Sequence, residues 1–93
     1  AAVALIPEGV EVIVCLDVDA LDPSIVPGVI GRAPGGLSYG QALDLIKGAA
    51  ARGRIAGMDV VEFMPEVDVD GLGALTVSRL LAASLGVIAR QGD

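Results

Sequence analysis

Three aspartates stand close together in the segment CLDVDALDP, at positions 17, 19 and 22. If Asp17 and Asp19 end an extended strand, their side chains point to the same face, with Cα atoms roughly 6.6 Å apart. Two carboxylates about 6 Å apart repel each other by roughly 2.8 kcal/mol at an effective dielectric constant of about 20. A divalent cation removes this repulsion, and a pair of ions could be held by both side chains. The alternative is that the two residues only begin a turn, and their spacing leaves both interpretations open.

Asp22, the third of these aspartates, and Glu62, which follows a second apolar stretch, can each be given a structural role. Asp22 precedes Pro23 and is interpreted as an ordinary turn residue. Glu62 could be a functional carboxylate or only a solvated acid at the end of a strand. The segment MPEVDVDG has the alternating acids of a calcium loop, but Val77 stands where that loop requires an acid. Calcium binding is therefore not expected.

Two apolar runs predict the β-strands that would position these acids. They cover Val10–Leu16 and Arg54 to about Glu62. Near-continuous apolarity is typical of a parallel strand covered on both faces. Between the two runs, the segment Leu21–Leu37 contains three prolines and four glycines, which predicts a long loop without regular structure. Loops of this length in compact domains are usually functional.

Two helices are predicted, one after each strand. Ser38 followed by Gln41 is a capping-box signature, and apolar residues then recur at helical spacing to about Arg52. The second helix is expected over Gly71 to about Arg90, with Asp70 as its N-cap. It is apolar on nearly every face, so we expect it to be sandwiched inside the protein rather than to span a membrane.

The order strand, helix, strand, helix predicts an α/β fold with a parallel sheet. In such sheets ligands bind beyond the carboxyl ends of the strands, where Asp17, Asp19 and Glu62 all fall. Residues 1–93 make one domain at most, and two parallel strands alone leave both sheet edges open. We therefore expect the chain to be a βαβα portion of a larger domain whose other strands lie upstream.

The composition narrows the class of partner. The net charge is −6, whereas nucleic acids require a basic surface, so a small cationic partner is expected instead. The single cysteine, Cys15, cannot form an internal disulfide, which favours a reducing cytoplasm. Because it falls within the first predicted strand, we expect it to be buried and inert. Pro7 and Glu8 interrupt the first apolar stretch, so neither an export signal nor a membrane partner is expected.

Three motifs in order resemble those of the ureohydrolase family, which includes arginase, agmatinase and guanidinobutyrase. They are CLDVDALDP, VPGVIGRAPGGLS and DVVEFMP. The corresponding family patterns are a strand end of the form Ser-x-Asp-x-Asp-x-x-Asp-Pro, a Pro-Gly loop leading into Gly-Gly-Leu-Thr, and Asp-x-x-Glu-x-x-Pro. The resemblance covers essentially all of this chain and the C-terminal third of a typical member, and it is closest to agmatinase-like members.

The resemblance implies a fold and a function. The fold would be a three-layer α/β/α sandwich with a parallel sheet, in a trimer or hexamer. Asp17 and Asp19 would be catalytic residues and ligands of a dinuclear manganese centre, and Glu62 would pair with the guanidinium group of the substrate. The implied reaction is hydrolysis of an agmatine- or guanidinobutyrate-type compound to urea and an amine by water that the metal ions activate.

The sequence also departs from the family pattern. Cys15 replaces the usual Ser, VIGRA replaces a frequent Thr-Gly-Thr-Pro-Glu segment, and the upstream motifs that supply two histidines and two further aspartates are absent. The chain alone is therefore expected to be inactive. Two alternatives stay open: a fragment of a haloacid-dehalogenase-like, magnesium-dependent phosphotransferase, although Ala20 fits its motif poorly, and a non-catalytic interaction domain with solvated acidic loops.

Overall fold

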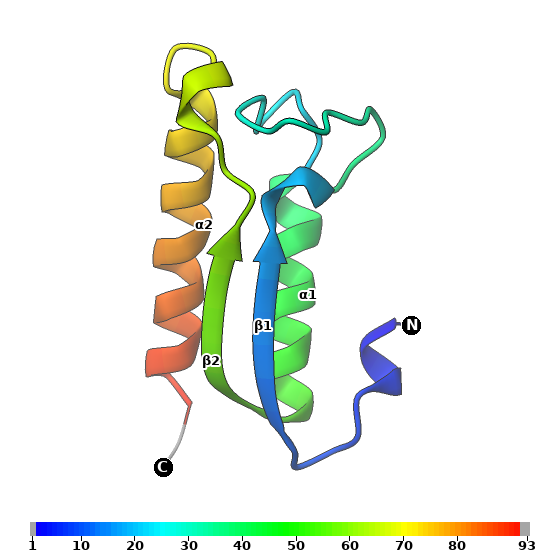
Figure 1. Ribbon diagram of the computed structural model, residues 1–93. Coiled ribbons are helices and arrows are strands. Elements are labelled where there is room, and N and C mark those ends of the chain that lie inside the picture. Colours follow the sequence, from blue (N-terminus) through cyan, green and yellow to red (C-terminus); the bar gives the residue numbers. More distant parts are fainter. Residues whose placement is uncertain (1, 92–93) are drawn as a thin grey trace.

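The computed structural model describes residues 2–91 and has the predicted order of strands and helices (Figure 1). The regular elements are β1 (Glu11–Asp17), α1 (Tyr39–Arg52), β2 (Arg54–Val61) and α2 (Leu72–Ala89), with short 3-10 turns η1 (Ala2–Leu5), η2 (Val18–Ala20) and η3 (Pro65–Val67). Each predicted strand and helix is confirmed, with boundaries close to those expected.

The two strands form a parallel sheet in which Glu11 pairs with Arg54 and Asp17 pairs with Val61. Parallel neighbours need a crossover connection, and α1 provides it. The capping box predicted for this helix is present: Ser38 Oγ accepts from the Gln41 amide at 3.1 Å, and Gln41 Oε1 accepts from the Ser38 amide at 2.9 Å. Both strands therefore point the same way, and the connecting loops stand above their carboxyl ends in Figure 1.

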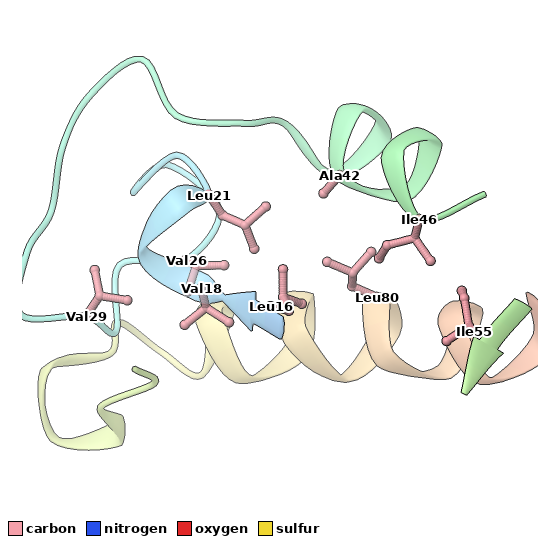
Figure 2. Packing of buried hydrophobic residues seen from close by; sticks show 9 residues of the cluster. All are labelled: Leu16, Val18, Leu21, Val26, Val29, Ala42, Ile46, Ile55 and Leu80. Atoms are coloured by element: carbon pink, nitrogen blue, oxygen red, sulfur yellow. The ribbon is translucent and has the colours of Figure 1, made fainter. Parts of the chain in front are cut away.

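The hydrophobic core lies between one face of this sheet and the two helices, which lie against each other. Figure 2 shows side chains from the strands, the long loop and both helices converging there. The buried cluster consists of Leu16, Val18, Leu21, Val26, Val29, Ala42, Ile46, Ile55 and Leu80. The chain thus contains the parallel sheet and one helical layer of an α/β sandwich.

The opposite face of the sheet is open, which corrects the expectation that both faces of the first strand are covered. Exposed and partly buried residues alternate along β1, and Ile13 is 74% exposed. Cys15 is also exposed, so its predicted burial is wrong. The physical reason is that no element within residues 2–91 packs on this face, and alternate side chains of a strand point to opposite faces.

Helix α2 is not sandwiched, contrary to the prediction. Leu80 is fully buried in the core, but Leu75 and Leu85 are 59% and 57% exposed. The described part of the chain supplies neighbours for only one side of this helix, and its other side carries leucines without a layer to bury them. By length and composition alone α2 could also cross a membrane, but core helices of soluble proteins meet the same criteria.

The cap of α2 is Asp68 rather than the predicted Asp70. The N-cap position is Gly71, which offers no side chain, and residues 70 and 71 both adopt left-handed backbone conformations. The chain turns there, so the Asp68 carboxylate accepts hydrogen bonds from the amides of Gly73 at 2.9 Å and Ala74 at 3.0 Å. These are amides of the first helical turn, which have no partner within the helix.

The long loop between β1 and α1 is closed at its neck. Leu37 donates its amide to Ala20 O, and Asp22 donates its amide to Leu37 O, both at 2.9 Å. The Asp22 carboxylate accepts from the amides of Ser24 at 3.0 Å and Gly35 at 3.3 Å. Asp22 therefore has the structural turn role that its position before Pro23 predicts.

Gly36→Ala should destabilise this neck. An added Cβ would lie 2.6 Å from the Asp22 amide nitrogen and 2.7 Å from the Leu21 carbonyl carbon, both backbone atoms that cannot rotate away. We expect a loss of about 1–3 kcal/mol in the free energy of unfolding. Gly40→Ala is the control: its Cβ would meet nothing within 4 Å, and replacing this helical glycine should not destabilise the protein but raise its stability by up to about 1 kcal/mol. Equal denaturant midpoints for the two variants would contradict the close approach.

Asp68→Asn should give a pH-dependent loss of stability. Burial acts to raise the pKa of Asp68, but the amides of Ala74, Gly73 and Val69 and the charge of Arg32 together hold it below its ordinary value of 3.8. A carboxyl whose pKa is lower in the folded state stabilises the fold above its unfolded pKa and loses this contribution as the pH falls through the folded value.

The difference in unfolding free energy between the native protein and Asp68→Asn should therefore be full above about pH 5 and shrink toward about pH 2. Denaturant titrations at several pH values measure it. Asp70→Asn is the matched control, because the Asp70 side chain makes no hydrogen bond to α2 within the described residues. A pH-independent difference for Asp68→Asn would show that the cap does not act through the carboxylate.

Candidate metal and substrate site

Asp17 and Asp19 lie at the carboxyl end of β1, but not on one continuous strand as expected. Asp17 is the last strand residue, and Asp19 belongs to the 3-10 turn η2. The strand-alternation argument for their shared face is therefore wrong. The chain turns here because Val18 and Leu21 both enter the core, with 0% and 1% exposure. An extended backbone would place these two side chains on opposite faces.

The turn brings the two aspartates together by another route. Asp17 is the N-cap of η2, and its Oδ1 accepts the Asp19 amide at 3.2 Å. The pKa of the Asp19 carboxyl is raised, chiefly by its hydrogen-bonding contact with the Asp17 side chain, then by burial and by the negative charges of Asp17 and Glu62. A cation between the two carboxylates would relieve this unfavourable interaction.

Glu62 follows β2 directly and faces the same region. The pairing of Asp17 with Val61 puts Glu62 one residue beyond the partner of Asp17. Its side chain is exposed, and its charge contributes to the raised pKa of Asp19. The three predicted site residues therefore lie together at the carboxyl edge of the sheet.

The backbone of Glu62 has a φ of +71°, in the left-handed region that side chains other than glycine rarely adopt. Such a conformation costs free energy and persists only where neighbouring structure holds it. On one side Glu62 continues β2, and two residues later the Met64 amide donates to Gly28 O at 2.6 Å. The carboxylate is thus carried on a backbone that is fixed on both sides.

The long loop forms a wall of the site, and the sequence did not predict which of its residues matter. Gly31 lies beside Asp19: a Cβ there would be 3.9 Å from Asp19 Oδ2. Its neighbour Arg32 donates to Pro27 O and Val67 O, both at 2.7 Å. Arg32 is the only basic residue in segments 22–37 and 62–71. This isolated positive charge was the feature of the sequence that could have pointed to Arg32.

Cys15 lies on the open face of the sheet, paired with Asp59 across the strands. Its hydrogen bond with Asp59 raises the pKa of the thiol, and burial and the negative charges of Asp59 and Asp17 raise it further. A thiol of raised pKa carries little thiolate, which is the nucleophilic form. Cys15 is therefore exposed but poorly activated.

A groove of about 240 Å³ runs along β1 and is lined by Asp17 together with mostly apolar side chains, among them Leu37 and Leu45. A larger hollow of about 320 Å³ lies between Tyr39 and Arg79, and none of the three site carboxylates lines it. The groove, although smaller, is the one that has a candidate site residue, Asp17, in its lining.

Asp17 and Asp19 suit a hard divalent cation such as Mn²⁺ or Mg²⁺, because carboxylate oxygens are the ligands that these ions prefer. Within residues 2–91, however, no set of three His, Cys, Asp or Glu side chains is arranged to hold a metal ion. The aspartate pair thus fits as part of a metal shell that needs further ligands.

Comparison with known proteins gives a consistent result. The model of the Arginase family matches residues 1–86. The chain is 46% identical over 76 residues to the mitochondrial arginase of Medicago truncatula, which covers 80% of this chain and 22% of that protein. It is 38% identical over 79 residues to the N(1)-aminopropylagmatine ureohydrolase of Thermus thermophilus, covering 85% and 26%.

The fold comparison agrees with the sequence comparison. Proclavaminate amidino hydrolase from Streptomyces clavuligerus superimposes with a TM-score of 0.81 at 31% identity, over 90% of this chain and 28% of that one. An agmatinase-like structure from Burkholderia thailandensis gives a TM-score of 0.76 at 31% identity, over 86% and 25%. The chain therefore spans about a quarter of the length of the relatives that it matches.

Glu62→Gly should make the protein more stable than Glu62→Ala. Both variants lose the carboxylate, but only glycine adopts the left-handed conformation without a Cβ penalty. We expect the glycine variant to unfold with a free energy about 1 kcal/mol higher. The matched control is Glu66, which lies in η3 and has no positive φ, so glycine there should be the less stable of the pair. The reverse order at position 62 would show that the conformation is not strained.

Proposed function

Because the chain belongs to the arginase family, we propose that it is the C-terminal segment of a ureohydrolase that hydrolyses a guanidino compound to urea and an amine. The observation that supports this most is the convergence of Asp17, Asp19 and Glu62 at one edge of the sheet. Family membership also sets aside a haloacid-dehalogenase-like phosphotransferase. The activity of the complete enzyme is a proposal, since the chain spans about a quarter of the length of its relatives.

In this proposal Asp17 and Asp19 hold two manganese ions. When bound, the ions would lower the pKa of water and so supply the nucleophile for hydrolysis at neutral pH. Asp17 lines the groove along β1, and its Oδ1 accepts the backbone amide of Asp19. The remaining ligands would come from the part of the enzyme outside these residues, and the 93-residue chain alone would be inactive.

Glu62 is proposed to bind the guanidinium group of the substrate. A guanidinium presents parallel N–H donors that match a carboxylate in a bidentate pair. The exposed side chain and the fixed backbone of Glu62 allow such a pair to hold the guanidinium carbon close to the aspartates. Arginases, agmatinases and an aminopropylagmatine ureohydrolase are among the relatives, and we favour an agmatine- or guanidinobutyrate-type substrate.

The exposed side of α2 and the open face of the sheet are proposed to be covered by the rest of the enzyme and by other subunits of a trimer or hexamer, rather than by lipid. The excess of acidic residues suits a cationic substrate and not a nucleic acid. We place the enzyme in the cytoplasm, since its single cysteine gives no sign of a disulfide framework.

The proposal is tested by assaying urea release from agmatine, 4-guanidinobutyrate and arginine. The assay uses the complete protein that carries these residues, loaded with manganese. We expect one of the three to be hydrolysed, with activity lost on chelation and restored by Mn²⁺. Failure to release urea from all three, in a folded protein with a full metal complement, would contradict the substrate class.

Asp17→Asn should lower kcat/KM by more than about 100-fold, because an amide cannot supply the charge that a carboxylate would give to the metal ions, and even changes behind the ligands cost 10- to 100-fold. Asp19→Asn should lose manganese, measured by elemental analysis, more than it alters KM. The matched control is Asp22→Asn in the same motif, since asparagine also closes such turns. Near-native turnover of Asp17→Asn at full manganese occupancy would contradict the ligand role.

A further inference from the structure

Two loops that follow different strands lie against each other above the sheet (Figure 1). The long loop comprises residues 22–36, and the Glu62 loop comprises residues 62–71. The Met64 amide donates to Gly28 O at 2.6 Å. A Cβ on Gly28 would lie 2.7 Å from the Phe63 ring and 3.1 Å from Asp68 Cβ. The loops therefore touch through their backbones at Gly28 and Met64, and a side chain at position 28 would push against the Phe63 ring and Asp68.

Arg32 provides the side-chain link between these loops. Its Nε donates to Pro27 O within the long loop, and its Nη2 donates to Val67 O in the Glu62 loop, both at 2.7 Å. The guanidinium is planar and rigid, so two bonds from one group fix the distance and angle between the two carbonyls. One side chain thus spans both loops.

Each loop carries a part of the candidate site next to this link. Gly31 precedes Arg32 and lies beside the Asp19 carboxylate. Glu62 begins the other loop in a left-handed conformation that its surroundings must maintain. β2 holds it from one side, while from the other the chain is held at Met64 by Gly28 and at Val67 by Arg32. Loss of the contact between the loops would therefore be expected to change the backbone conformation at Glu62.

We propose that Arg32 is a positioning residue that ties the long loop to the Glu62 loop and so sets the place of the Glu62 carboxylate relative to Asp17 and Asp19. The role in substrate binding rests on the proposed function. Direct contact between Arg32 and the substrate is disfavoured, because both are cations and the two bonds of Arg32 are already made to backbone carbonyls.

The first experiment measures KM, kcat and manganese content of the complete protein for three variants. Arg32→Met keeps the aliphatic stem and removes the donors, and Arg32→Lys keeps the charge and removes the planar fork. Arg90→Met is the control, because Arg90 is exposed and follows α2 at the end of the helix away from both loops. We expect kcat/KM to fall roughly 10- to 100-fold in Arg32→Met, mainly through a rise in KM, with manganese unchanged. Arg32→Lys should recover only part of this loss, and Arg90→Met should behave as the native enzyme.

Two kinetic results would overturn the positioning role. A joint loss of kcat and manganese in Arg32→Met would show that Arg32 supports the aspartate pair or the fold instead. Full recovery in Arg32→Lys would show that its charge matters and its two directed bonds do not.

The second experiment measures amide hydrogen exchange and does not depend on activity. The Met64 amide is protected by its bond to Gly28, so Arg32→Met should speed exchange in both loops and leave β1, β2 and α1 unchanged. Unchanged exchange would overturn the link between the loops, and faster exchange with native KM would overturn its effect on Glu62. If the native enzyme releases no urea, the proposed function fails, while the exchange result still decides whether Arg32 ties the loops.

Discussion

The parallel pairing of β1 with β2 is the constraint on which the rest of the molecule depends. Its register sets Asp17 beside Val61, and Glu62 therefore follows at the same edge as the two aspartates. Parallel strands require a crossover, and α1 makes it while its Ala42 and Ile46 fill the core. A pairing shifted by one residue would turn every side chain of the shifted strand to the other face of the sheet. The hydrophobic core and the site would then both be lost.

The charges at this edge are unbalanced in a way that favours cationic ligands. Three carboxylates lie near one another, and the Asp19 carboxyl has a raised pKa because of its contact with Asp17, burial and the nearby negative charges. Arg32 is the one basic residue in the surrounding loops, but its hydrogen bonds go to main-chain carbonyls and not to these carboxylates. Carboxylates that this arginine does not neutralise suit a metal ion and a positively charged substrate, which are the ligands of the proposed ureohydrolase.

The exposed apolar surfaces agree with a chain that spans about a quarter of the length of its relatives. One face of the sheet carries the exposed Ile13 and Cys15, and α2 carries exposed leucines opposite the buried Leu80. Apolar residues that run almost continuously along a strand or surround a helix are expected where layers lie on both sides. The sequence pattern thus describes a three-layer fold, while residues 2–91 contain the sheet and one helical layer.

The sequence by itself determined the elements and the location of the site, because these depend on short-range patterns. Ser38 and Gln41 cap α1 through their own side chains, and the prolines and glycines of the long loop forbid regular structure whatever surrounds them. Tertiary structure decided what depends on contacts between distant residues. Burial of Val18 and Leu21 turned the chain at Asp19, so the aspartates meet through a turn rather than along a strand. Left-handed residues 70 and 71 moved the cap of α2 back to Asp68. Arg32 binds Val67 from 35 residues away, and no local pattern predicts such a bond, since it forms only when the parallel sheet brings the two loops to the same edge.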